Sequence, residues 1–191
     1  MASLHKYTQG AAVAMIKHNE RTLPPPADGH IDLDRAQDNY AIDLGDDRTV
    51  GHAYEYYRKR LSELKHRDRK DAVHLGSWIV TLPKDADKPE EFFSAVTAFL
   101  ADRYGRDNAI SAIVHEDEPN AMPHVHFLFM PGTEDGRLCA KEVLCRSDLR
   151  TFHGDLQRYL RQNGLNGTVS KSVTSTKNMH AGAVLDGKRR W

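Results

Sequence analysis

The feature that most constrains the fold is the alternation of histidine and apolar residues in residues 124–130, HVHFLFM. Because successive side chains of a β-strand point to opposite faces, His124 and His126 share one face while Val125 lies on the other. A second apolar run, residues 109–115, precedes this one, and a polar loop containing prolines joins the two. The pattern predicts two neighbouring antiparallel strands.

A third histidine completes a candidate metal site. His115 ends the first predicted strand, so it can join His124 and His126 as a set of three ligands with open positions for a substrate. Open coordination suits phosphodiester chemistry, in which a divalent cation stabilises charge on phosphate oxygens. Asp117 and Glu118 are close in sequence and could orient an imidazole or accept a proton. The alternatives are histidines that only fill a half-buried strand, and a purely structural metal.

Strands and helices are mixed along the rest of the chain. Apolar residues that recur three and four positions apart, together with capping and breaking residues, predict four helices. These are residues 11–21, residues 54–64, the segment between Pro89 and Gly105, and the segment from a cap at Ser147 to Gly164. Residues 77–82 predict a buried strand, and residues 40–44 a weak one. The fold class is therefore α+β, with a central antiparallel sheet flanked by helices. We expect residues 1–191 to form a single domain, in which the segment after about residue 167 is loosely held.

The charge of the chain is balanced overall but segregated locally. It has 27 basic and 27 acidic residues, so no global field attracts nucleic acid. Basic residues nevertheless cluster on and after the second predicted helix, and those we consider candidate DNA contacts are Arg58, Lys59, Lys65, Arg67, Arg69 and Lys70. Such a cluster can bind a DNA backbone, although a solvated helix face is the ordinary alternative.

Cysteine usage and hydropathy indicate a cytoplasmic location. Cys139 and Cys145 lack the CxxC spacing of a zinc or redox pair, which favours reduced thiols. The N-terminus has no apolar signal core, and no stretch is apolar enough for a membrane span. We therefore expect no membrane contact from this segment.

Several motifs in order give the chain a family likeness. KHNERT at residues 17–22 and HIDLDRAQDNY at residues 30–40 precede the histidine segment, with RKDAV at residues 69–73 and WIVT at residues 78–81 between them. DGRLCAKEVLCRSDL at residues 135–149 and DLQRYL at residues 155–160 follow it. Together they resemble the MobV, or Pre/Mob, family of plasmid mobilisation relaxases among the HUH endonucleases. The likeness extends from residue 10 to about residue 167.

The resemblance implies an HUH relaxase fold and a metal-dependent enzyme that nicks one DNA strand at a plasmid transfer origin. It also implies a covalent 5′-phosphate adduct on His18, with Glu118 holding the other ring nitrogen. Arg21, three residues on and expected on the same helix face, would contact a phosphate. Asp32, Arg35, Asn39 and Tyr40 are the motif residues with supporting roles.

The same resemblance implies particular partners and cofactors. The partners are single-stranded and hairpin DNA of the origin, and a homodimer formed through a helical region absent from this chain. Mn²⁺ or Mg²⁺ suits the phosphoryl chemistry, whereas three imidazoles also suit Zn²⁺ or Ni²⁺. The loop before the second histidine, PNAMP, is longer than is usual in the family.

Other assignments stay open at the level of sequence. His18 can be an ordinary surface histidine, in which case a tyrosine would be the nucleophile, and Tyr40, Tyr54, Tyr56 and Tyr57 are available. A DNA-binding module that recognises an origin without cutting it is a different class of function. A third alternative is an HUH enzyme of rolling-circle replication or transposition.

Overall fold

A computed structural model shows a mixed sheet at the centre of the protein. It describes residues 1–23, 31–45, 48, 51–67, 69–119, 121–169 and 178–179. The sheet has six strands in the order β2-β4-β5-β3-β1-β6. Their bounds are β1 Ala2–Thr8, β2 Tyr40–Ala41, β3 Val73–Thr81, β4 Ala109–His115, β5 His124–Phe129 and β6 Asn178–Met179. All neighbouring pairs are antiparallel except β1 and β6.

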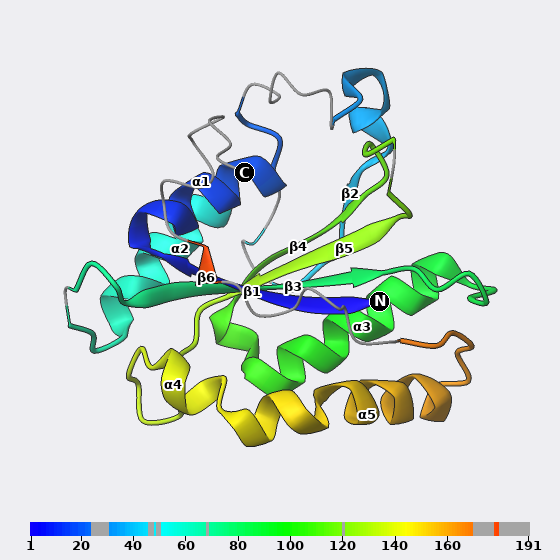
Figure 1. Cartoon of the computed structure of the whole chain (residues 1–191). Coiled ribbons are helices and arrows are strands. Elements are labelled where there is room, and N and C mark those ends of the chain that lie inside the picture. The colour runs from blue at the N-terminus through cyan, green and yellow to red at the C-terminus, as the bar shows by residue number, and fades with distance from the viewer. Residues whose placement is uncertain are drawn as a thin grey trace, which may run out of the picture.

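Helices cover both faces of the sheet (Figure 1). On one face, which we call the upper face, lie α1 (Gln9–Asn19) and α2 (Ala53–Glu63). On the lower face lie α3 (Pro89–Tyr104), α4 (Ala140–Val143) and α5 (Arg146–Gln162). Two 3₁₀ helices, η1 (Leu33–Asp38) and η2 (Arg106–Asn108), lead into β2 and β4. The predicted α+β fold, an antiparallel sheet flanked by helices, is confirmed.

The histidine-bearing strands occupy the middle of the sheet. In β4 and β5, His115 pairs with His124 and Ile113 pairs with His126, so these four side chains face the same way. Every residue of both strands is buried, because these strands lie inside the sheet and helices pack on both of its faces. The predicted antiparallel pair is therefore confirmed.

Stacked aromatic rings form the lower core. The ring of Trp78 on β3 stacks on Phe152 of α5, with centroids 3.5 Å apart, and Tyr104 of α3 stacks on Phe129 of β5 at 4.3 Å. The indole Nε1 of Trp78 donates to the Tyr104 hydroxyl at 3.0 Å, which satisfies a polar atom in this apolar layer. These contacts fix α3 and α5 against the strands.

The upper core is smaller and positions the first helix. α1 buries Ala12, Met15 and Ile16 against the sheet, where Leu75 and Leu128 contribute to the same apolar cluster. This packing leaves the last turn of α1 beside the histidine ends of β4 and β5, since the carbonyl oxygen of Asn19 lies 3.0 Å from Nε2 of His115. The apolar face of α1 thus determines where His18 lies.

Three local expectations were wrong. α1 ends at Asn19, so Arg21 does not share a helix face with His18. The N-cap of α5 is Cys145, and Ser147 lies in the first turn instead. β1 was missing from the expected strands, because its alternation is interrupted by polar residues, yet it pairs with β3 along its whole length.

Two further expectations concern the C-terminal segment and membrane-spanning helices. Of the segment after residue 167, which we expected to be loosely held, only residues 168–169 and 178–179 lie within the described part of the chain. Within the described ranges, every helix is too short or too polar to traverse a lipid bilayer.

We expect Gly76→Ala to destabilise the fold by about 1–3 kcal/mol through overpacking. A Cβ at Gly76 would lie 2.6 Å from two ring carbons of Phe129, whose ring cannot yield because it stacks on Tyr104. Urea denaturation followed by circular dichroism measures the change in the free energy of unfolding.

Gly154→Ala in α5 is the matched control. Its Cβ would meet nothing within 4 Å, and alanine is the better helix former, so we expect a gain of about 0.5–1 kcal/mol. Equal effects of the two substitutions would contradict this account of the lower core.

Candidate active site

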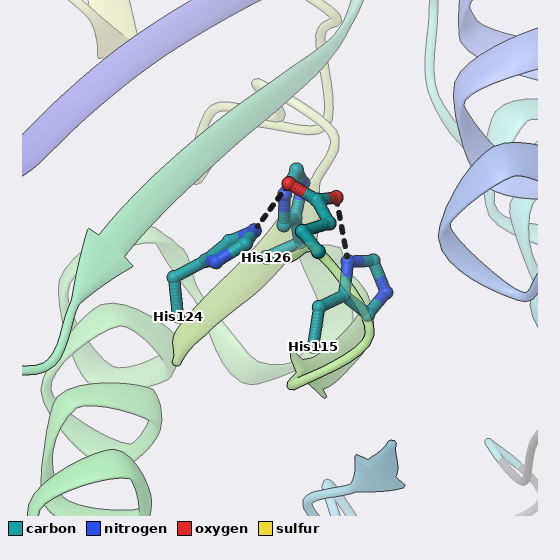
Figure 2. Close-up of side chains that lie close together, drawn as sticks. His115, His124 and His126 are labelled. Atoms are coloured by element: carbon teal, nitrogen blue, oxygen red, sulfur yellow. Dashed lines mark ion pairs between the residues drawn. The ribbon is translucent and has the colours of Figure 1, made fainter. Parts of the chain in front are cut away.

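Three buried imidazoles converge at one end of the β4–β5 pair. The ring centroids of His115 and His126 are 4.8 Å apart, those of His124 and His126 5.1 Å, and those of His115 and His124 5.7 Å. Glu118 joins them, and one ligand atom from each of the four side chains lies within 4.8 Å of the others. Figure 2 shows the three rings around a common centre, with dashed lines where the Glu118 carboxylate approaches the rings of His115 and His124.

Backbone carbonyls determine which ring nitrogens face this centre. Nε2 of His115 lies 3.0 Å from the carbonyl oxygen of Asn19, and Nδ1 of His124 lies 3.0 Å from that of Met122. A carbonyl only accepts, so these nitrogens carry the protons. The unprotonated atoms are therefore Nδ1 of His115, 3.9 Å from Glu118, and Nε2 of His124, 3.6 Å from it.

Burial keeps two of the imidazoles, His115 and His126, uncharged. It lowers the pKa of His115 to about 3, with a further contribution from the nearby Arg21 guanidinium. Burial also lowers the pKa of His126 well below its usual range, and the surrounding imidazoles add to the effect. Neutral imidazoles offer lone pairs at physiological pH.

The donor set fits a divalent cation. In the described part of the structure, Nδ1 of His115 and Nδ1 of His126 are buried and have no hydrogen-bond partner. Such atoms are costly to bury unless something coordinates or hydrogen-bonds them. Imidazole nitrogens with one carboxylate are a donor set used for first-row transition metals such as Mn²⁺, Zn²⁺ and Ni²⁺.

His18 of α1 lines a hollow together with members of the histidine cluster. The hollow has a volume of about 640 Å³, and its lining includes His18, His124, His126 and Glu118. The His18 ring centroid is 6.4 Å from those of His115 and His126. Burial lowers the pKa of His18, and the charge of Arg21 lowers it further, so this ring is also neutral at physiological pH.

Arg21 connects His18 to the acidic loop that follows β4. It has φ 54°, in the left-handed region, which turns the chain back at the end of α1. Its guanidinium donates to both oxygens of Asp117, at 2.7 and 2.6 Å, to Glu118 at 3.1 Å, and to Nε2 of His18 at 3.2 Å. Arg21 therefore meets His18 as expected, but by this turn and not along a helix.

Asp117 is bound to Arg21 and to none of the three imidazoles of the cluster. Its side chain is fully buried, and although burial raises its pKa, the hydrogen bonds from Arg21 outweigh that effect and hold the pKa at about 2. The carboxylate is thus charged at neutral pH. Glu118, in contrast, lies at the imidazole cluster.

The four motif residues divide into two groups. Two support the acidic loop, because the Asp32 amide donates to the Asp117 carbonyl at 2.8 Å and the Asn39 side chain accepts from the Glu116 amide at 2.8 Å. The other two are elsewhere. Arg35 is exposed and pairs with Asp38, and Tyr40 pairs with Val114 on β4, so its side chain packs against the lower core.

The predicted DNA-binding residues lie away from the hollow. All six are exposed, on α2 or in the segment between α2 and β3: Arg58, Lys59, Lys65, Arg67, Arg69 and Lys70. Lys65, Arg67 and Arg69 line a second hollow with Arg137 and Lys141. We call these six residues the α2 basic surface.

The tyrosines proposed as alternative nucleophiles do not line the hollow. The Tyr57 hydroxyl is 3.0 Å from Nδ1 of His74, and Tyr54 stacks on Tyr57 with centroids 6.5 Å apart. The Tyr56 hydroxyl donates to the Asp107 carbonyl. Tyr40 packs against the lower core, on the face of the sheet opposite the hollow.

Several residues of the site were not anticipated from the sequence. The carbonyls of Asn19 and Met122 orient two imidazoles, but a carbonyl carries no sequence signal. Ile31, Ile79 and Met122 line the hollow beside the histidines. Of these, Met122 is the side chain that could have been noticed, because it is a large apolar residue in a polar loop and is 43% exposed.

Residues 1–181 match the family model described as plasmid recombination enzyme, Mob_Pre. The chain belongs to this family. Among its relatives are plasmid recombination enzymes of Lactiplantibacillus plantarum, 29% identical over 94% of this chain and 51% of the relative, and of Bacillus thuringiensis, 30% identical over 78% and 34%. A type 1 enzyme of Staphylococcus aureus is 38% identical over 58% of this chain and 29% of the relative.

Solved structures agree with this membership. The relaxase domain of MobM (MOBV; Mob_Pre), bound to plasmid pMV158 oriT DNA in Mn-bound crystals, matches with TM-score 0.75 and 27% identity, over 93% of this chain and 94% of that one. A further MobM relaxase domain bound to 26-nucleotide oriT DNA matches with TM-score 0.66 and 25% identity over 94% and 95%. The chain has the fold of this relaxase domain, but it spans only about a third to a half of the curated enzymes above.

We expect Asp117→Ala to lower the free energy of unfolding by about 3–5 kcal/mol, because it leaves the guanidinium of Arg21 without its buried partner. Asp135→Ala removes an exposed partner of Arg137 and should lower the free energy of unfolding far less, because solvent screens that pair. Both values come from urea denaturation. A loss at Asp117 no larger than that at Asp135 would show that the buried pair does not stabilise the fold.

Proposed function

We propose that this chain is a relaxase domain, a metal-dependent endonuclease and strand transferase that nicks one strand at a plasmid transfer origin. The observation that carries the proposal is that His18 lines the same hollow as His124, His126 and Glu118, three members of the four-residue cluster that could hold a metal. Membership of the plasmid recombination enzyme family supports it, as does the likeness to a MobM relaxase domain bound to oriT DNA.

His115, His124 and His126 would hold the cation, with Glu118 at its edge. A cation bound there supplies Lewis-acid stabilisation of charge on the non-bridging phosphate oxygens. Mn²⁺ is the ion we favour, because the MobM crystals are Mn-bound and because phosphoryl transfer suits it. Mg²⁺ is the second choice for activity, and the imidazoles would also accept Zn²⁺ or Ni²⁺.

His18 would be the nucleophile. Arg21 can only donate, so the His18 nitrogen that it contacts, Nε2, carries the lone pair, and Nδ1 carries the proton. Nε2 would attack phosphorus, forming the N–P bond as the bond from phosphorus to the 3′ oxygen breaks. The proton released from the imidazole passes to the 3′ oxygen, which leaves as a hydroxyl, and the 5′ phosphate stays on His18.

Arg21 and Glu118 suit the charges of this step. Arg21 lies against the attacking nitrogen, where its guanidinium could donate to the phosphate oxygens as they approach. The negative charge of Glu118 raises the pKa of His18, against the larger lowering by burial and by Arg21. It would therefore stabilise the positive charge that the ring acquires during attack. Its predicted hydrogen bond to His18 stays a prediction.

The rest of the substrate would follow two surfaces. Ile31, Ile79 and Met122 form an apolar wall beside the proposed nucleophile, which suits the sugar and base of an extended single strand. The α2 basic surface would contact the DNA backbone, with affinity but little sequence information. We propose single-stranded and hairpin origin DNA as the substrate, and homodimer formation stays a prediction from the family resemblance.

Metal binding is testable apart from catalysis. Mn²⁺ should bind the EDTA-treated protein and raise its melting temperature, and His126→Ala should weaken the affinity at least about 100-fold because a ligand is lost. His66→Ala, at an exposed histidine outside the cluster, is the control and should bind Mn²⁺ as the parent does. Isothermal titration calorimetry gives the dissociation constants. Unchanged affinity in His126→Ala would rule out this ligand set.

The nucleophile can be identified from the covalent product. The parent protein is incubated with Mn²⁺ and a 3′-labelled origin oligonucleotide. The label should then migrate with the protein in denaturing electrophoresis, because the 3′ fragment is covalently attached. His18→Ala should reduce adduct formation at least about a thousandfold. Tyr→Phe variants at positions 40, 54, 56 and 57 are the matched controls and should react within about twofold of the parent, because none of these side chains lines the hollow.

The chemistry of the adduct gives a second, independent readout. A phosphorus–nitrogen bond is cleaved by acid and survives alkali, whereas a tyrosine phosphodiester survives acid. An acid-stable adduct, or one that persists in His18→Ala, would overturn the assignment. Origin binding with neither nicking nor adduct would instead favour the non-cleaving DNA-binding module.

A further inference from the structure

The outer face of α5 carries a row of arginines. Arg146, Arg150, Arg158 and Arg161 are all exposed, and at 3.6 residues per turn they fall within an arc of about 120° on the helix. The fifteen residue steps from first to last extend over about 22 Å along the axis. We call this set the α5 arginine face.

The acidic residues of α5 do not neutralise this face. Asp148 and Asp155 point inward and accept from Arg103 of α3, at 2.8 and 3.0 Å. Arg158 shares Asp155 at 3.0 Å. The other three arginines have no ion-pair partner among the residues that the structure describes. A chain with zero formal net charge thus concentrates unpaired positive charge on one helix.

The residues between the arginines are small or polar. Ser147, Thr151 and Gly154 lie between them, and a hollow of about 490 Å³ opens at Gly154, lined also by Gln157, Arg158, Arg161 and Gln162. Phe152, Leu156 and Leu160, the buried apolar residues of α5, are on its inner side. In the described part of the chain the exposed large apolar residues are Met1 and Met122, neither of them on α5.

This composition identifies the class of partner. A helix that lies in a membrane surface needs an exposed apolar face, and a protein interface has apolar or aromatic anchors at its centre, but the α5 face offers neither. Single-stranded nucleic acid is held by exposed aromatic rings, which are also missing here. Exposed arginine forks, separated by small residues such as Ser147 and Gly154, match the phosphates of a duplex.

We propose that the α5 arginine face binds the phosphate backbone of duplex DNA, independently of base sequence. Its length of about 22 Å corresponds to about six base pairs at 3.4 Å each. α5 covers the lower face of the sheet (Figure 1), whereas the side chains of His124 and His126 lie on the upper face with Leu128. This duplex is therefore a different stretch of DNA from the one at the proposed metal site. The inference does not depend on the proposed nicking activity.

The test compares two double variants with the same loss of charge. Arg150→Gln/Arg161→Gln removes two unpaired cations from α5, and Lys84→Gln/Lys88→Gln removes two exposed cations outside it. Binding of a fluorescent 20-base-pair duplex of unrelated sequence is measured by anisotropy in EDTA, from about 50 to 200 mM salt. EDTA prevents metal-dependent chemistry, so the readout is binding alone. Equal melting temperatures confirm that both variants fold.

We expect the α5 variant to bind the duplex about tenfold more weakly and the slope of log affinity against log salt to fall by about 1.8, for two lost phosphate contacts. The Lys84/Lys88 control should stay within about twofold of the parent. Equal losses in the two variants, or no measurable duplex binding by the parent, would overturn the proposal. So would a loss of binding to phosphatidylserine vesicles with duplex affinity unchanged, which would identify a membrane surface instead.

This outcome is separable from the proposed function. Nicking of a short single-stranded origin oligonucleotide should be unaffected by Arg150→Gln/Arg161→Gln, since that substrate is too short to reach α5 from the metal site. A parent protein that binds duplex through α5 yet never nicks would leave this inference standing and refute the relaxase proposal.

Discussion

The pairing of β4 with β5 is the constraint on which the site depends. Because His115 pairs directly with His124, and Ile113 with His126, three imidazoles face one side at the end of the pair. A slip of one residue would turn the β5 histidines into the lower core and expose Val125 and Phe127 on the upper face. That error would bury polar rings among the aromatic residues around Trp78, so the lower core itself enforces the register that assembles the site.

The buried ion pair of Arg21 and Asp117 joins two segments that are 96 residues apart. α1 is positioned by its apolar face, yet that packing alone would leave its end free to rotate relative to the acidic loop. The left-handed turn at Arg21 costs about 1–2 kcal/mol for a residue with a side chain. Two short, charge-assisted hydrogen bonds in a buried setting offset it and hold His18 at the hollow.

The sequence allowed the convergence of the three histidines, the sheet and the family to be predicted, for identifiable reasons. Alternation placed His124 and His126 on one face, and the ordered motifs pointed to the family that the comparisons show. The amino-acid sequence did not allow the Arg21–Asp117 pair to be predicted, because no local sequence pattern indicates a turn with positive φ at an arginine. It also failed for β1, whose pairing with β3 depends on contacts distant in sequence. Both are effects of tertiary structure that periodicity does not encode.

A cation bound at the histidine cluster would link metal binding to the stability of the fold. His115 and His126 are almost completely buried, and each leaves a ring nitrogen without a hydrogen-bond partner in the described structure. Each such atom costs about 1–3 kcal/mol, a cost that coordination by a cation would remove. Since His115 also donates to the carbonyl of Asn19, a cation that orders this ring would order the end of α1 as well. The same cation would thereby also stabilise the helix end that positions His18, the proposed nucleophile.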